Sequence, residues 1–190
     1  KCMSMGFLVQ EEEPMIWRGP MVMSAMEQML NDVIWAPLDF LIVDMPPGTG
    51  DIQLTLAQST QLAGAVMVST PQDIALLDTR KGINMFRRIR VPILGIIENM
   101  SYFICPHCGD RSDIFASGGA ERLAKEDNSD FLGAIPLDIE IRETSDAGRP
   151  IVISKASGAH ALAYMNIAQR MLENLKKSDD DRITPKITID

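Results

Sequence analysis

Two cysteines separated by two residues form a pattern that can bind a metal centre. Residues 105–109 read Cys-Pro-His-Cys-Gly, so the thiols of Cys105 and Cys108 can reach one metal, and the glycine lets backbone amides turn toward the sulfurs. One such pair supplies two ligands, whereas a tetrahedral zinc site or a [4Fe–4S] cluster takes four. Cys2, His107 and His160 are not spaced as a second pair. The simplest completion is a twofold dimer that brings two identical pairs together.

The same cysteine pair has two other interpretations. In thiol–disulfide oxidoreductases the first cysteine of such a motif lies at a helix N-terminus, which lowers its pKa. Here the residues that follow, Gly109 to Asp113, make a poor helix start. The other interpretation is an exposed zinc knuckle with a purely structural role. The residue types and their spacing leave all three interpretations open.

A second pattern surrounds a carboxylate at the end of an apolar run. Residues 38–44 end in Asp44 and are typical of a buried parallel strand, and the Pro/Gly-rich residues 45–51 are typical of a loop. An aspartate there can hold a hydrated Mg²⁺, and Gly48 and Gly50 let backbone N–H groups approach a terminal phosphate. Alternatively, Asp44 only caps the next helix. Two prolines and two glycines nevertheless stiffen and bend this loop beyond what a helix cap requires.

Apolar runs and helical periodicities alternate along the chain, which indicates an α/β fold. Strands are expected at residues 38–44, 65–69, 93–97 and 131–135. Helices are expected from Pro20, over 52–62, from Asp73 until Pro92 forbids further turns, and over 157–176. Strands that are apolar on both faces belong to a mostly parallel sheet flanked by helices. Residues 176–190 carry a charge run and a proline, and are expected to form a flexible tail.

Polar residues follow each expected strand. Ligands of open parallel sheets bind beyond the carboxyl ends of the strands. The sequence therefore predicts a ligand site formed by Asp44 with its loop and by residues 69–73, 98–100 and 136–138.

Length and composition exclude several classes of protein. A chain of 190 residues is one domain or a large part of one. Its net charge of −8 argues against nucleic-acid binding, and 46% hydrophobic residues exclude wholesale disorder. No apolar run approaches the roughly 20 residues that cross a bilayer. Three cysteines are too few for a secreted disulfide framework, so a reducing compartment is expected. The start at Lys1-Cys2, without an initiator methionine, suggests a piece of a longer protein.

The sequence resembles the Mrp/ApbC family of iron–sulfur-carrying P-loop ATPases, which are relatives of MinD and ParA. The resemblance covers about residues 1–175. It rests on the following stretches: 3–8 (MSMGFL), 17–22 (WRGPMV), 43–51 (VDMPPGTGD), 69–73 (STPQD), 98–103 (ENMSYF), 105–108 (CPHC) and 133–138 (GAIPLD). Within the family, the chain is similar both to bacterial carriers and to mitochondrial members that serve the assembly of respiratory complex I.

The resemblance implies a homodimer that bridges one [4Fe–4S] cluster through Cys105 and Cys108 of both subunits. It further implies that Asp44 is the catalytic, Walker B-type aspartate near Mg²⁺, and that Gly48 lies in the switch loop that senses the γ-phosphate of ATP. Asn99 would face the adenine. The other residues implied near the base or ribose are Gln72, Pro136 and Asp138. ATP binding and hydrolysis would then bias the dimer geometry and the release of the cluster.

One departure from the family pattern concerns the phosphate-binding loop. P-loop ATPases cradle the phosphates with Gly-x-x-x-x-Gly-Lys-Ser/Thr, but no glycine of this sequence is followed by lysine. In the family this loop precedes the region that the chain resembles. We therefore expect residues 1–175 to be the C-terminal portion of a single MinD-like P-loop NTPase domain, without its first strand and P-loop.

The function predicted from the resemblance is that of an ATP-dependent carrier or scaffold that transfers [4Fe–4S] clusters to apoproteins, among them complex I subunits for the mitochondrial members. The alternatives are a MinD/ParA-like regulatory ATPase without a cluster and a dithiol oxidoreductase. A reducing compartment means the mitochondrial matrix or the bacterial cytoplasm.

Overall fold

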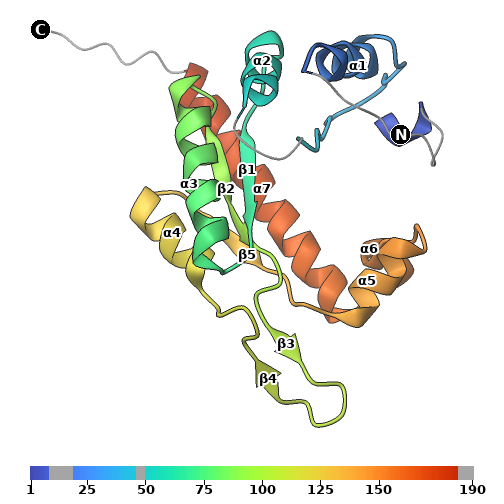
Figure 1. Ribbon diagram of the computed structural model, residues 1–190, viewed down its shortest axis with the longest axis vertical. Coiled ribbons are helices and arrows are strands. Elements are labelled where there is room, and N and C mark those ends of the chain that lie inside the picture. Colours follow the sequence, from blue (N-terminus) through green and yellow to red (C-terminus); the bar gives the residue numbers. More distant parts are fainter. Residues whose placement is uncertain (9–18, 46–49, 184–190) are drawn as a thin grey trace, which may run out of the picture. The chain divides into compact units, whose positions relative to one another are not determined.

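The computed structural model describes residues 1–8, 19–45 and 50–183. The chain divides into two compact units, Lys1–Gln61 and Leu62–Asp190 (Figure 1). No helix among the described residues is both long enough and apolar enough to span a membrane.

The first unit consists of helices around a small apolar core. The short 3₁₀ helix η1 spans Met5–Phe7, α1 spans Gly19–Asn31 and α2 spans Asp51–Ser59. Pro20 stands in the first turn of α1, as expected, because proline suits a position whose N–H has no helical partner. The buried residues Val22 and Met26 are one helical turn apart and meet Leu56 of α2.

The strand expected at residues 38–44 is wrong, since these residues have no regular secondary structure. Val43 packs against the Leu56 cluster, whereas Phe40 and Ile42 are 54% and 75% exposed. An apolar run becomes a strand only when a neighbouring strand satisfies its N–H and C=O groups. No strand lies among the described residues of this unit, so the run stays irregular.

The second unit contains a parallel sheet in the order β1–β2–β5. Its strands are β1 (Ala65–Ser69), β2 (Ile93–Glu98) and β5 (Phe131–Ala134). The three strands predicted in this part of the chain and their parallel arrangement are thereby confirmed.

Helices cover both faces of this sheet, which gives the expected α/β class. Helices α3 (Asp73–Arg88) and α4 (Gly119–Asp127) lie on one face, and α7 (Ala159–Ile183) lies on the other (Figure 1). Successive strand residues point to opposite faces, so Ile96 packs in the core beneath α3 and α4 while Ile97 packs toward α7.

The closing helix is longer than the sequence predicts. It continues to Ile183, through part of the segment expected to be a tail. Neither glycine nor proline occurs between Ala159 and Ile183, so nothing in the local sequence ends the helix before Pro185.

Three further elements lie beyond the carboxyl ends of the strands, and none of them was predicted. The hairpin of β3 (Phe103–Ile104) and β4 (Arg111–Ser112) projects from the end of the sheet (Figure 1). Helices α5 (Ile139–Asp146) and α6 (Ile151–Ser154) follow β5 and pack beside the start of α7.

Candidate functional site

Backbone hydrogen bonds join the segments that follow the three parallel strands. The N–H of Asn99 donates to the carbonyl of Ser69 at 2.8 Å, which links the ends of β2 and β1. The N–H of Ile135 donates to the carbonyl of Glu98 at 2.8 Å, and the N–H of Ser101 donates to the carbonyl of Ile135 at 2.9 Å. These hydrogen bonds therefore bring residues of three loops together at one edge of the sheet.

Three of the residues expected near a nucleotide lie at this edge. Gln72 is the N-cap residue of α3, and its side-chain oxygen accepts a hydrogen bond from the Thr70 hydroxyl. The side-chain oxygen of Asn99 accepts from the N–H of Met100 at 3.0 Å. Gln72 and Asn99 are half-buried, and Pro136 is buried. The sheet edge thus offers two half-buried amide side chains, while contact with a nucleotide stays a prediction.

Asp138 is held by two neighbours at the start of α5. One carboxylate oxygen accepts from the N–H of Glu140 at 2.8 Å and caps the helix, and the other lies 3.3 Å from Nε2 of His160. Oxygen atoms of Asp138 and Glu140 and a ring nitrogen of His160 lie within 4.8 Å of one another. Lys155 forms an ion pair with Glu140, so an ammonium group already compensates part of this negative charge.

The two remaining nucleotide residues of the sequence prediction fall within the first unit of the chain. Asp44 is exposed and belongs to the first unit. Gly48 lies outside the described residues. Their roles at Mg²⁺ and at the γ-phosphate stay predictions.

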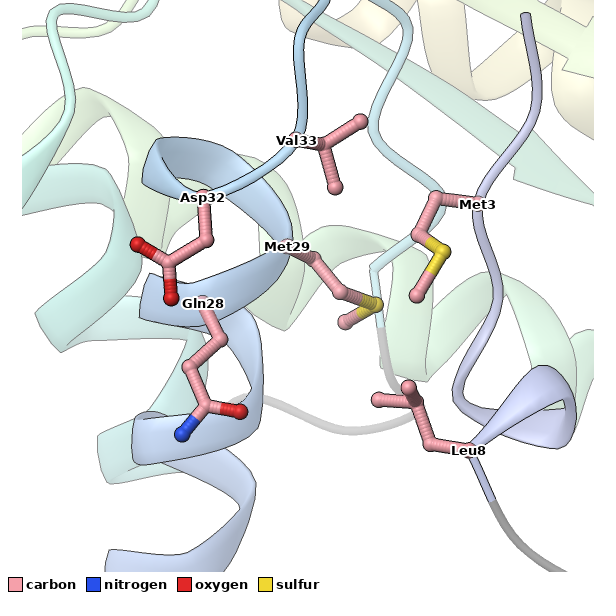
Figure 2. Close-up of a pocket in the computed structure, with 6 residues that line it drawn as sticks. All are labelled: Met3, Leu8, Gln28, Met29, Asp32 and Val33. Carbon is pink, nitrogen blue, oxygen red and sulfur yellow. The ribbon is translucent and has the colours of Figure 1, made fainter.

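The first unit also has a small hollow of about 160 Å³ (Figure 2). Apolar side chains dominate its lining, and it contains no residue of the predicted site. The lining residues are Met3, Leu8, Gln28, Met29, Asp32 and Val33.

Both predicted metal ligands lie in the loop of the β3–β4 hairpin. The N–H of Cys105 donates to the carbonyl of Asp110, and the N–H of Gly109 donates to the carbonyl of Cys105, both at 2.9 Å. Gly109 has φ +75°, a conformation that favours glycine. Cys108 is exposed and Cys105 is half-buried, so both thiols lie near solvent. The motif therefore opens a turn rather than a helix, as its sequence indicates.

The loop favours a thiolate at Cys105. The backbone N–H of Cys108, then that of His107, and then the Cys108 side chain lower the pKa of the Cys105 thiol, because they donate to its charged form. The Cys108 sulfur lies 3.2 Å from Oδ2 of Asp110. Thiolates bind iron and zinc, so the donor set of this loop fits half of a four-sulfur site for either metal.

The lowered pKa predicts a pH profile for alkylation. A lowered pKa in the folded chain means that Cys105 reaches half of its maximal rate with iodoacetamide at a lower pH when folded than when unfolded in urea. Mass spectrometry that assigns the label to Cys105 across a pH series measures both profiles. Coincident profiles would show that the loop does not stabilise the thiolate.

One buried carboxylate at the sheet edge belongs to the ligand site predicted at residues 98–100, but it had no role of its own in that prediction. Glu98, the last residue of β2, is 1% exposed and accepts hydrogen bonds from three donors. The only signal in the sequence is a charged residue that closes an apolar strand. Its donors are 3, 20 and 22 residues away, so local patterns do not reveal them.

The chain is similar to a known protein family and to several named proteins. A family model described as "ParA: NUBPL iron-transfer P-loop NTPase" matches residues 1–172. The Arabidopsis thaliana "Iron-sulfur protein required for NADH dehydrogenase, mitochondrial" is 50% identical over 192 residues, which cover 100% of this chain and 61% of that protein. The Escherichia coli (strain K12) "Iron-sulfur cluster carrier protein" is 51% identical over 172 residues, which cover 90% of this chain and 47% of that protein.

A solved structure shows the same fold. The nucleotide-binding protein of Archaeoglobus fulgidus, in complex with ADP, has a TM-score of 0.63 and 38% identity, and the match covers 72% of this chain and 55% of that one. The chain spans 61% and 47% of the length of the two relatives above. From the family model and these identities, the chain belongs to the NUBPL iron-transfer P-loop NTPase family.

Proposed function

We propose that this chain is part of an ATP-dependent carrier that holds a [4Fe–4S] cluster as cargo and transfers it to apoproteins. The observation that carries the proposal is the hairpin, which projects from the sheet and holds Cys105 and Cys108 near solvent at its turn. A cargo that is handed to another protein must be accessible, and the solvent-facing cysteine loop meets this requirement. The names of the relatives, an iron–sulfur cluster carrier among them, support the same function.

A homodimer supplies the four sulfur ligands that such a cluster takes. Each hairpin offers two thiols, and a twofold axis beside the hairpin brings two pairs to one cluster. Ile104 and Ile114, which flank the cysteine loop, are 40% and 55% exposed, so contact between hairpins would also bury apolar surface.

ATP with Mg²⁺ is the proposed nucleotide of the complete protein. The amide side chains of Gln72 and Asn99 suit a base or ribose, and Pro136 and Asp138 stand in the loop between β5 and α5. Asp44 and Gly48 are assigned to Mg²⁺ and to the γ-phosphate by the family motif. Hydrolysis would supply the free energy that changes the dimer geometry and so favours release of the cluster.

The proposed recipients are apo iron–sulfur proteins. Subunits of respiratory complex I are the proposed clients if this chain acts as its Arabidopsis relative does, whose name states that it is required for NADH dehydrogenase. The proposed compartment is the mitochondrial matrix or the bacterial cytoplasm, where thiols stay reduced.

The metal content after anaerobic reconstitution tests the proposal. A cluster shared by two chains gives about two iron and two sulfide per chain, with the visible absorption of a [4Fe–4S] cluster and the elution volume of a dimer. Zinc at about half an atom per chain, with no iron uptake, would indicate a structural metal bridge instead. Binding of no metal would contradict the carrier and favour a regulatory ATPase.

A further inference from the structure

Glu98 makes more hydrogen bonds than a strand-end residue needs. Its Oε1 accepts from the Ser101 hydroxyl at 2.5 Å and from the N–H of Gly118 at 2.9 Å. Its Oε2 accepts from the N–H of Ala120 at 2.8 Å. Hydrogen bonds to an ionised, buried carboxylate are stronger than neutral ones, and removing an acceptor leaves buried donors unpaired.

The three donors lie on both sides of the cysteine hairpin. Ser101 precedes β3, whereas Gly118 and Ala120 follow β4 at the start of α4. The segment 101–118 therefore begins and ends at hydrogen bonds to the same carboxylate, that of Glu98. The N-terminus of α4 favours this arrangement, because its first N–H groups have no helical partners and attract negative charge.

Backbone hydrogen bonds also tie the start of the hairpin. The N–H of Ser101 donates to the carbonyl of Ile135 at 2.9 Å, and the N–H of Leu137 donates to the carbonyl of Tyr102 at 2.7 Å. On the hairpin side, both bonds involve only residues before β3. The two strands of the hairpin are two residues each, and the ion pair of Arg111 with Asp113 stays within the hairpin region and is exposed. An exposed ion pair contributes little to order. Among the described residues, Glu98 is thus a buried side chain that hydrogen-bonds to both ends of the cysteine segment.

The geometry points to Glu98 as a positioning residue that fixes the cysteine hairpin on the sheet edge and so sets how firmly the cluster is held. This inference rests on the proposed function for the identity of the cargo. Two thiols on a fixed segment bind a metal more tightly than two on a mobile one, because less freedom is lost on binding. Glu98 acts on the cargo only through the position of Cys105 and Cys108.

Three variants of the chain test this inference. Glu98→Gln keeps the shape of the side chain but replaces one acceptor oxygen by an NH₂ group. This group is a donor and faces another N–H or hydroxyl donor, so at least one hydrogen bond is lost. Ser101→Ala removes a single donor and is the milder change, for use if Glu98→Gln does not fold. The control is Asn174→Ala, which removes the 2.9 Å hydrogen bond from Nδ2 of Asn174 to the carbonyl of Leu94, at the other end of β2.

Hydrogen exchange of the metal-free chain is the first measurement. We expect Glu98→Gln to raise exchange at residues 101–118 by about 10- to 100-fold, the equivalent of one lost charged hydrogen bond, with little change in α3 and α7. Ser101→Ala gives the same pattern to a smaller extent, and Asn174→Ala leaves the hairpin unchanged. An equal rise throughout the second unit in Glu98→Gln, or no local rise in Ser101→Ala, would overturn the inference.

The rate at which a chelator removes iron from the reconstituted dimer is the second measurement. We expect faster loss of the visible absorption in Glu98→Gln than in Asn174→Ala, even where urea unfolds both variants at the same concentration. If Glu98→Gln and Asn174→Ala are equally stable and lose iron at equal rates, Glu98 only stabilises the fold and does not position the cysteines. If the wild-type chain binds no iron, the proposed function fails, and the exchange measurement alone then decides the role of Glu98.

Discussion

We expect the Cys105→Ala chain to take up less than about a tenth of the iron and sulfide that the wild-type chain binds, and the Cys108→Ala chain to behave the same way. In the proposed dimer either variant would offer two thiolates instead of four, and a [4Fe–4S] cluster needs a ligand at each iron. His107 lies between the two cysteines but cannot supply the missing sulfur. Iron and acid-labile sulfide per chain, with the visible spectrum, measure the loss after anaerobic reconstitution.

The third cysteine provides the matched control. Cys2 is exposed and belongs to the first unit, so Cys2→Ala changes the thiol count by the same amount without touching the hairpin. It should keep the full iron content. Iron bound normally by Cys105→Ala, or lost equally by Cys2→Ala, would show that the hairpin pair does not hold the cluster.

The Gly95→Ala substitution should lower the free energy of unfolding by about 3 kcal/mol, from backbone strain together with overpacking. Gly95 is buried in β2 with φ +145°, a conformation that side chains rarely adopt. A Cβ there would lie 2.5 Å from Cγ of Leu132 and 2.8 Å from the carbonyl oxygen of Asp130. That oxygen accepts the hydrogen bond from the N–H of Ile96 at 2.8 Å, so it cannot move without breaking the sheet. Urea unfolding measures the change.

Gly148→Ala separates strain from crowding. Gly148 also has a positive φ, +65°, but a Cβ there would meet no atom within 4 Å. We expect a loss of about 1 kcal/mol from conformation alone. A loss at Gly95 no larger than that at Gly148 would contradict the close packing of β2 against β5.

The sequence predicts those strands whose partners also lie in the described fold. Residues 65–69, 93–97 and 131–135 are apolar on both faces, and each became a strand because its neighbours are present in the same sheet. Residues 38–44 carry the same pattern without a partner among the described residues of their unit. The hydrophobic pattern of a segment indicates that it can form a strand. Whether it forms one depends on pairing with a neighbouring strand.

Short elements and long-range contacts explain part of what was missed, whereas the unpredicted helices α4 and α5 are nine and eight residues long. Strands β3 and β4 have two residues each, too few for a periodic signal. The cysteine pair could be predicted because both candidate ligands stand within four residues, whereas the contacts of Glu98 depend on Gly118 and Ala120. The family was recognised from seven short stretches and is confirmed by the comparisons. The roles of the nucleotide residues and of the cysteine pair stay predictions.

The position of α7 has a consequence for the newly made chain on the ribosome. The face of the sheet that contains Leu132 and Ile135 is covered by Ile167 and its neighbours in α7. Translation from residue 134 to residue 183 takes between roughly 2 and 10 seconds at cellular rates. Helices α3 and α4, which cover the opposite face, are synthesised before this interval begins. The α7 face of the sheet stays exposed until α7 has been synthesised. Nascent chains of this family should therefore engage chaperones through the α7 face of the sheet, and a stall before residue 159 should prolong that contact.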